Sequence, residues 1–375
     1  MRRALGRLAL VLTSLALGFV LLECSVDYLL DPFRCDSELG WSFEPGSRTL
    51  KLSRVREFGP IQVGINADGF RDDAWSAEKP KGAYRIAVLG DSIVAALQVE
   101  HAHLFTTLLQ QRLDADSVPG RSVEVLNAGV DGYGTAQELS VLRDHVARFA
   151  PDLVLLSMYL GNDITDNYTE TGRSSHYLER RCGRPYVALR EGSLIPLGEP
   201  RDWKPHSPNL LDRALRVSTL FDNFAPLPPE EAKLRSVDVF RREPHAALVE
   251  AWTLTQALVL AVRDEAARQG ARFAVLAMPS GVEAGQHSHA SFAEVHDVDA
   301  PIRRLLEFLE PNGIPYLDLQ RPMRARVDAG KRLYFERDSH FDVRGHAALA
   351  DEIAGWLEQR CEELGIPVAG CEPGP

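Results

Sequence analysis

Three residues have the types and the sequence context of a nucleophile, its base and the carboxylate that orients the base. Ser92 ends the tripeptide 90–92, Gly-Asp-Ser, directly after the apolar run at 86–89, and His340 lies two residues after Asp338. A serine hydroxyl becomes a nucleophile when a histidine takes its proton and a carboxylate holds that histidine in the right tautomer. We therefore expect Ser92 to be a nucleophile, His340 its base and Asp338 the carboxylate that orients the base.

Two further positions, Gly129 and Asn162, follow the next two apolar runs along the chain. Gly129 has no side chain, so its backbone N–H can approach a bound oxygen, and Asn162 offers an amide N–H. Together with the N–H of Ser92 these groups form a set of three donors for a developing oxyanion. Each motif alone also fits a plainer role, because Ser and Asn cap helices and Gly forms turns.

The apolar pattern predicts the elements that bring these residues together. Short apolar runs indicate buried strands, and longer runs with helical spacing indicate amphipathic helices. Because strands and helices alternate, we expect a parallel sheet covered by helices on both faces, with the site at the carboxyl ends of the strands. The expected strands are 86–89, 123–126, 153–158, 273–278 and 315–319, and the expected helices are 105–113, 136–149, 246–269, 301–309 and 347–357.

The same pattern divides the chain into parts. We expect one α/β domain over 81–360, preceded by an irregular segment at 25–80 that is rich in Gly, Pro and charge. Residues 165–245 interrupt the alternation and are predicted to form an irregular insertion, because long stretches without a pattern of their own are usually functional loops. Residues 361–375 are predicted to form a C-terminal tail.

The first apolar run predicts a membrane anchor over 1–24. Basic residues precede the run, and a helix over 4–22 is long enough to span a bilayer. The positive charges keep the N-terminus inside, so we expect a bacterial inner-membrane protein with its catalytic domain in the periplasm or outside. A cleaved signal peptide and a lipid on Cys24 remain alternatives, although Glu23 directly before Cys24 is a poor match for lipidation.

An exported chain can keep disulfides, and four cysteines lie beyond the predicted anchor. They allow three pairings, and free thiols are also open. We expect Cys361 to pair with Cys371, because both lie in the polar tail. The remaining two cysteines are Cys35 and Cys182.

Composition excludes several other classes of function. The formal net charge of −11 argues against nucleic acid as a partner, since phosphate binding needs a positive field. No C-x-x-C pair is present, and His287, His289 and His296 lie in a stretch expected to be a solvated loop. We therefore expect neither a metal nor another cofactor.

The motifs in their order resemble the SGNH/GDSL hydrolase superfamily. In that superfamily a Ser in a Gly-Asp-Ser block, a Gly, an Asn and a His occupy four successive blocks, which here match Ser92, Gly129, Asn162 and His340. The resemblance spans about 84–165 and 270–358. It implies a flavodoxin-like three-layer fold with a five-stranded sheet, a Ser92 nucleophile, a His340 base and an oxyanion hole formed by Ser92, Gly129 and Asn162.

One departure from the common family pattern concerns the carboxylate. The usual spacing is Asp-x-x-His, but position 337 is Arg337, and Asp338 gives Asp-x-His instead. That spacing resembles the branch of the superfamily involved in polysaccharide O-acetylation. Asp342 and Gly345 fit the residues that follow the family histidine, and this register favours His340 over His346 as the base.

These expectations combine into a functional hypothesis. The sequence predicts an exported, membrane-anchored serine esterase that hydrolyses an O-acyl ester, with acetyl as the expected group, on a small molecule or a glycan. Two alternatives stay open. One is an O-acyltransferase acting on cell-envelope polysaccharide, and the other is a non-catalytic glycan-binding protein on the same fold.

Overall fold

The computed structural model describes residues 6–7, 10–15, 17–18, 32–51, 57–169, 177–197, 234–287, 294–338 and 340–371, and the statements below concern these residues. Most of the predicted anchor at 1–24, with Cys24, lies outside them, so the anchor stays a prediction. Leu10, Leu12 and Leu15, in its described part, are exposed.

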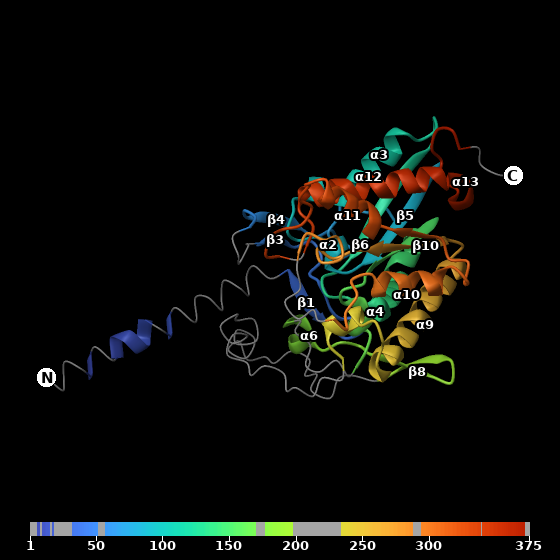
Figure 1. Cartoon of the computed structure of the whole chain (residues 1–375). Helices are drawn as coiled ribbons and strands as arrows, with labels where there is room; N and C mark the ends of the chain where they lie inside the picture. The colour runs from blue at the N-terminus through green and yellow to red at the C-terminus, as the bar shows by residue number, and fades with distance from the viewer. Residues whose placement is uncertain are drawn as a thin grey trace.

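Five parallel strands form the centre of the fold (Figure 1). Their order across the sheet is β11-β10-β7-β5-β6, so the chain starts in the interior and moves to both edges. This confirms the predicted five-stranded parallel sheet. The strands are β5 (Ala83–Gly90), β6 (Ser122–Gly129), β7 (Leu153–Tyr159), β10 (Arg272–Met278) and β11 (Tyr316–Asp318).

Helices cover both faces of this sheet, which gives the predicted three layers. Successive strand residues point to opposite faces, so Ala87 and Leu89 join one hydrophobic cluster while Ile86 and Val88 join another. The first cluster contains residues of α4 (Thr135–Val141), α9 (Ala246–Arg268) and α10 (Ala300–Leu309). The second contains residues of α3 (Phe105–Ala115), α11 (Gln320–Asp328) and α12 (Val343–Gln359).

Two helices differ from their predicted extents by more than two residues at one end. The stretch predicted as one helix over 136–149 is α4 followed by a π-helical turn at Leu142–Val146 and a 3-10 turn at Ala147–Phe149. Helix α12 begins at Val343, because the Asp342 side chain accepts the N–H groups of Arg344 at 2.9 Å and Gly345 at 3.1 Å.

Among the described residues, helix α9 is long enough and apolar enough to cross a membrane. Its apolar residues have partners within the protein, because Leu258, Val259 and Val262 are buried and the helix packs against α4 and β10.

The segment at 25–80, predicted to be irregular, contains two antiparallel hairpins in its described part. They are β1 (Phe33–Asp36) with β2 (Gly40–Phe43), and β3 (Arg48–Lys51) with β4 (Ile61–Gly64). Trp41 and Phe43 are fully buried in the core of the α/β domain. The Trp41 indole also donates to the carbonyl of Asp131 at 2.9 Å. The prediction was wrong here because four-residue strands are too short to give a clear pattern.

The insertion at 165–245 contains regular elements where it is described, although 170–176 and 198–233 lie outside the described residues. These elements are α6 (Tyr177–Cys182), a hairpin of β8 (Val187–Arg190) with β9 (Ser193–Pro196), and a 3-10 helix at Ser236–Phe240. A disulfide between Cys35 and Cys182 ties α6 to β1.

The C-terminal stretch is part of the domain up to residue 371. Helix α13 (Cys361–Leu364) follows α12 directly, and Ile366 and Val368 are buried. A disulfide joins Cys361 to Cys371, which confirms the predicted pair. The boundary predicted at 361 is therefore wrong, because these residues pack against the second hydrophobic cluster.

Candidate active site

Ser92 lies at the first turn of a short helix, α2 (Ser92–Ala95), directly after β5. Asp91 caps this helix by accepting the N–H of Ile93 at 2.9 Å. The chain turns tightly, since a Cβ on Gly90 would lie 2.3 Å from Val94 Cγ2. Within the described residues neither the hydroxyl nor the backbone N–H of half-buried Ser92 makes a hydrogen bond. Both groups therefore remain available to a reactant.

Arg71, from the N-terminal segment, holds the end of α2. Its guanidinium is fully buried and donates to the carbonyls of Ala95 at 2.9 Å, Ala96 and Val99. These contacts fix the turn in which Ala96 adopts a positive φ of 44°. Burial lowers the pKa of Arg71 to about 10, so the side chain still carries its charge at neutral pH.

His340 and Asp338 form a hydrogen-bonded pair in the loop before α12. Asp338 Oδ1 bonds to His340 Nδ1 and also accepts the His340 N–H at 3.0 Å. This leaves Nε2 of the ring for a reacting proton. Burial lowers the pKa of His340, but its hydrogen bond to Asp338 and the charges of Asp338, Asp131 and Asp91 together raise it above the ordinary value.

Asp91, which directly precedes Ser92, and His340 are near enough for the charge of each to shift the pKa of the other. The two loops also share a core, because Ile93 and Val94 belong to the same hydrophobic cluster as Phe341. The structure thus pairs His340 with Asp338 and packs their loop into the same hydrophobic cluster as the helix that follows Ser92.

Glu57 supports the loop that carries Asp338. Its carboxylate accepts the backbone N–H groups of Glu336 at 2.6 Å, Arg337 at 2.9 and 3.0 Å, and Asp338 at 2.8 Å. Burial acts to raise the pKa of Glu57, and the three N–H groups outweigh it, so that pKa lies below its usual value. Nothing in the spacing of the sequence pointed to Glu57, because its partners lie about 280 residues away.

Gly129 has a packing role in the structure. Its N–H donates to Asn127 Oδ1 at 3.1 Å, and a Cβ would lie 2.5 Å from Val94 Cβ. The predicted free donor is thus already engaged. Gly132, three residues on, has a φ of 75° and an N–H without an acceptor in the described part of the chain. The Asp-Gly pair at 131–132 is the turn signal that could have pointed to it.

Asn162 links the Ser92 turn to the loop after β7. Its amide nitrogen donates to Asp91 Oδ2 and to Asp166 Oδ2, both at 3.2 Å. These distances are at the long end of hydrogen bonding. Asn162 is therefore linked to the residue that precedes Ser92, and a bond from its amide to an oxyanion has to replace one of these two contacts.

The buried carboxyl groups of Glu138, Asp163 and Asp91 lie near enough for their charges to interact. Glu138 is 1% exposed, and neither of its oxygens has a hydrogen-bond partner among the described residues. Asp163 is fully buried and accepts the Tyr159 N–H at 2.7 Å through one oxygen only. Burial, with the charge of Asp91, raises the pKa of both side chains well above the usual value. Burial and the neighbouring carboxylates therefore favour the neutral form of Glu138.

Burial also raises the pKa of Asp91, to about 6. His346, by contrast, is a structural histidine. Its Nδ1 accepts the N–H of Phe105 at 3.2 Å, and burial lowers its pKa to about 3, so it stays neutral. This favours His340 as the base.

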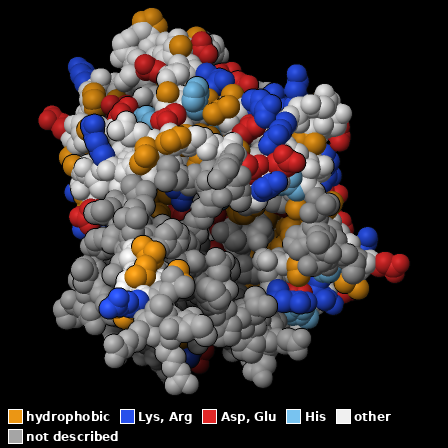
Figure 2. All heavy atoms as spheres, turned by 90° about the vertical axis from the view of Figure 1, so that its left-hand side faces the viewer, with side chains coloured by type: hydrophobic (Ala, Val, Ile, Leu, Met, Phe, Trp, Pro, Cys, Tyr) orange, Lys and Arg blue, Asp and Glu red, His pale blue; other side chains and the backbone are white. Residues whose placement is uncertain are grey.

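No three His, Cys, Asp or Glu side chains within the described residues are arranged to hold a metal ion. His289 lies outside those residues. Positive and negative side chains intermingle over the described part of the face that carries β1, β3 and α6 (Figure 2).

A family model described as "SGNH hydrolase-like domain, acetyltransferase AlgX" matches residues 239–368. This stretch includes Asp338 and His340 and lies after the Ser92 motif. No curated protein matches the chain.

Several solved structures are similar at low sequence identity. TesA has a TM-score of 0.40 at 14% identity, covering 73% of this chain and 98% of that one. Axe2, an acetylxylan esterase from Geobacillus stearothermophilus, has 0.40 at 14%, covering 73% and 94%. A lipase/acylhydrolase from Enterococcus faecalis has 0.39 at 14%, covering 74% and 96%. The family match over residues 239–368 and the ordered motifs at Ser92, Gly129, Asn162 and His340 both indicate similarity to the SGNH/GDSL hydrolase superfamily, and the five-stranded parallel sheet agrees with the fold that this similarity implies.

Proposed function

We propose that this protein is a serine-dependent enzyme that acts on O-acyl esters, with acetyl as the expected acyl group. The observation that carries the proposal is the juxtaposition of two loops. His340, oriented by Asp338, is near enough to Asp91 for their charges to interact, and the next residue is Ser92, whose hydroxyl makes no hydrogen bond among the described residues. The oriented base and the free hydroxyl are the two parts that acyl transfer needs.

The proposed reaction has two halves. Neutral His340 takes the Ser92 proton at Nε2 while the serine oxygen bonds to the ester carbonyl carbon. The oxyanion accepts hydrogen bonds from the N–H groups of Ser92 and Gly132, and from Asn162 once it releases a carboxylate. The ester C–O bond then breaks, and His340 returns the proton to the leaving alcohol. In the second half water, activated by His340, removes the acyl group from Ser92.

A second candidate is transfer of the acyl group to a sugar hydroxyl in place of water. The family match over residues 239–368 favours it, because that model is named for an acetyltransferase. The Asp-x-His spacing at 338–340 favours it as well. The two candidates share the first half-reaction and differ only in the acceptor that attacks acyl-Ser92.

We further propose that the enzyme is exported and anchored in a bacterial inner membrane by residues 4–22. Two disulfides support this, since such bonds persist in oxidising compartments and are rare in the cytosol. The expected partners are the membrane and a small-molecule or glycan ester. Protease accessibility of the domain in intact spheroplasts tests the location, and complete protection would contradict it.

The test of the chemistry uses the full chain in detergent with a panel of acetyl and longer-chain aryl esters. Ser92→Ala is expected to lower turnover by at least about 10³-fold. Ser193→Ala, which removes an exposed hydroxyl on β9, serves as the matched control and should leave turnover unchanged. Adding neutral oligosaccharides then separates the candidates, because a transferase forms acylated sugar at the expense of free acid. Turnover that survives Ser92→Ala contradicts the proposal.

A further inference from the structure

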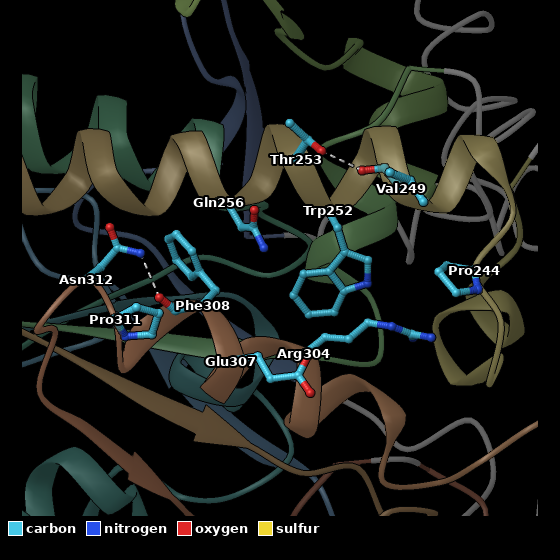
Figure 3. Close-up of a pocket in the computed structure, with 10 residues that line it drawn as sticks. All are labelled: Pro244, Val249, Trp252, Thr253, Gln256, Arg304, Glu307, Phe308, Pro311 and Asn312. Atoms are coloured by element: carbon cyan, nitrogen blue, oxygen red, sulfur yellow. Dashed lines mark hydrogen bonds between the residues drawn. The ribbon is translucent and has the colours of Figure 1, made fainter.

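A pocket of about 430 Å³ lies between α9 and α10, the two helices on the outer side of the first layer (Figure 3). Ligand pockets commonly measure a few hundred cubic ångströms. Trp252 and Gln256 enter the pocket from α9, one helical turn apart, and Arg304, Glu307 and Phe308 enter it from α10. Its lining includes none of the residues proposed for the reaction.

Trp252 presents a buried donor that lacks an acceptor. The side chain is 5% exposed, and its ring nitrogen has no hydrogen-bond partner within the described residues. A buried indole N–H usually finds a partner, because leaving it unbonded is costly. In Figure 3 the ring nitrogen points toward the Pro244 side of the pocket. The pocket therefore calls for a ligand that carries an acceptor oxygen.

Gln256 and Glu307 add unengaged polar groups on opposite walls. The Gln256 amide extends from α9 into the pocket in Figure 3, and Glu307 lies across from it on α10. Neither side chain makes a hydrogen bond in the described part of the chain. An amide both donates and accepts, and a carboxylate accepts from hydroxyl groups. The ligand therefore needs donors as well as acceptors.

Arg304 does not offer its charge to an anion. The guanidinium donates to the carbonyls of Val239 at 2.9 Å, Arg241, and Arg242 at 3.1 Å, which engages it with the loop before α9. Glu307 also stands nearby as an opposite charge. The pocket thus favours an uncharged ligand.

Apolar surface completes the lining, from Phe308, Val249 and the ring of Pro311. Hydroxyl groups at the edge of a ring and C–H groups on its faces match this combination of amide, carboxylate, indole N–H and apolar walls. We propose that this pocket binds a neutral pyranose residue of a polysaccharide. The binding itself does not depend on the reaction at Ser92, although a second hold on a polymer would serve that reaction.

The experiment measures binding of xylohexaose, mannohexaose, cellohexaose and chitohexaose to the full chain in detergent by calorimetry. At least one hexaose should bind at millimolar concentration. Trp252→Phe keeps the aromatic ring but removes the N–H, and Gln256→Ala removes the amide. Each should weaken binding roughly 5- to 10-fold, the worth of about one hydrogen bond.

Two controls make the result specific. Trp356→Phe, on α12 in the opposite layer, should leave binding unchanged. Ser92→Ala should also bind normally, so failure of the catalytic proposal is seen separately. Thermal unfolding checks that each variant folds, and Gln256→Ala carries the test if Trp252→Phe does not. Absence of binding by all four hexaoses, or equal affinity in both pocket variants, overturns the proposal, as does preferential binding of proline-rich peptides.

Discussion

Replacement of Glu57 tests whether the N-terminal segment positions the catalytic loop. Glu57 has no proposed role in the reaction itself, but its carboxylate accepts hydrogen bonds from three consecutive backbone N–H groups, those of Glu336, Arg337 and Asp338. Glu57→Ala leaves these donors without their acceptor, and Glu57→Gln replaces one acceptor oxygen by a donor. We expect the first change to loosen the loop and the second to loosen it less.

The magnitude follows from the contacts. A hydrogen bond to a charged group is worth about 1.5–3 kcal/mol, but the loop is near the surface and water replaces part of each bond. We therefore expect Glu57→Ala to reduce the free energy that favours the ordered loop by about 2 kcal/mol, which is far less than the sum over three hydrogen bonds. If the loosened loop is inactive, kcat should fall about 10- to 30-fold, since 1–2 kcal/mol corresponds to a factor of 5–30. KM should change little.

The pH profile separates a positioning role from general destabilisation. The pKa of His340 is raised partly by its bond to Asp338. A loosened loop weakens that bond, so the acid limb of kcat/KM should move to lower pH. Glu336→Ala is the matched control, because it removes a carboxylate from the same loop whose side chain is 76% exposed. A Glu57→Ala enzyme with normal kcat and an unmoved acid limb would refute the reasoning.

Three further perturbations address other contacts. His340 must be neutral to act as a base, and its pKa is raised, so kcat/KM should rise with pH through a midpoint above 6.5. Asp338→Asn should lower both that midpoint and kcat. An unchanged pH–rate profile contradicts the pairing of Asp338 with His340. Glu138→Met removes a buried carboxyl group that has no hydrogen-bond partner among the described residues, and should therefore raise the free energy of unfolding in urea by about 1–3 kcal/mol. A Glu138→Met variant that is less stable than wild type contradicts an unpaired carboxyl at this position. Arg71→Met leaves the carbonyls of Ala95, Ala96 and Val99 without their donor and should lower the free energy of unfolding in urea by about 3 kcal/mol. A variant as stable as wild type contradicts a stabilising role for Arg71.

The elements of the sheet and their order could be predicted from the sequence because each is marked locally. Strands such as β7 are buried on both faces and read as continuous apolar runs, and α9 shows helical spacing over 23 residues. The hairpins at 33–64 escape this reading, because four-residue strands carry too little pattern. Their place in the core depends on long-range contacts such as the Trp41 indole with the Asp131 carbonyl.

The candidate site likewise contains residues that the local sequence indicates and residues that only long-range contacts reveal. Asp338 and His340 have distinctive neighbours in the sequence, so their pairing could be predicted. The engagement of the Gly129 N–H could not, since it depends on the Asn127 side chain folding back onto it. Glu57 acts through backbone groups about 280 residues away, which no local spacing encodes.

The central claim is that Ser92 carries the acyl group. The most direct measurement is mass spectrometry of the full chain quenched during turnover of an aryl acetate, followed by peptide mapping. We predict an acetyl mass increment on the peptide that contains Ser92, absent from Ser92→Ala and accumulating in Asp338→Asn if deacylation slows. Turnover without any acyl adduct on Ser92, or an adduct on another residue that Ser92→Ala leaves intact, would contradict the account.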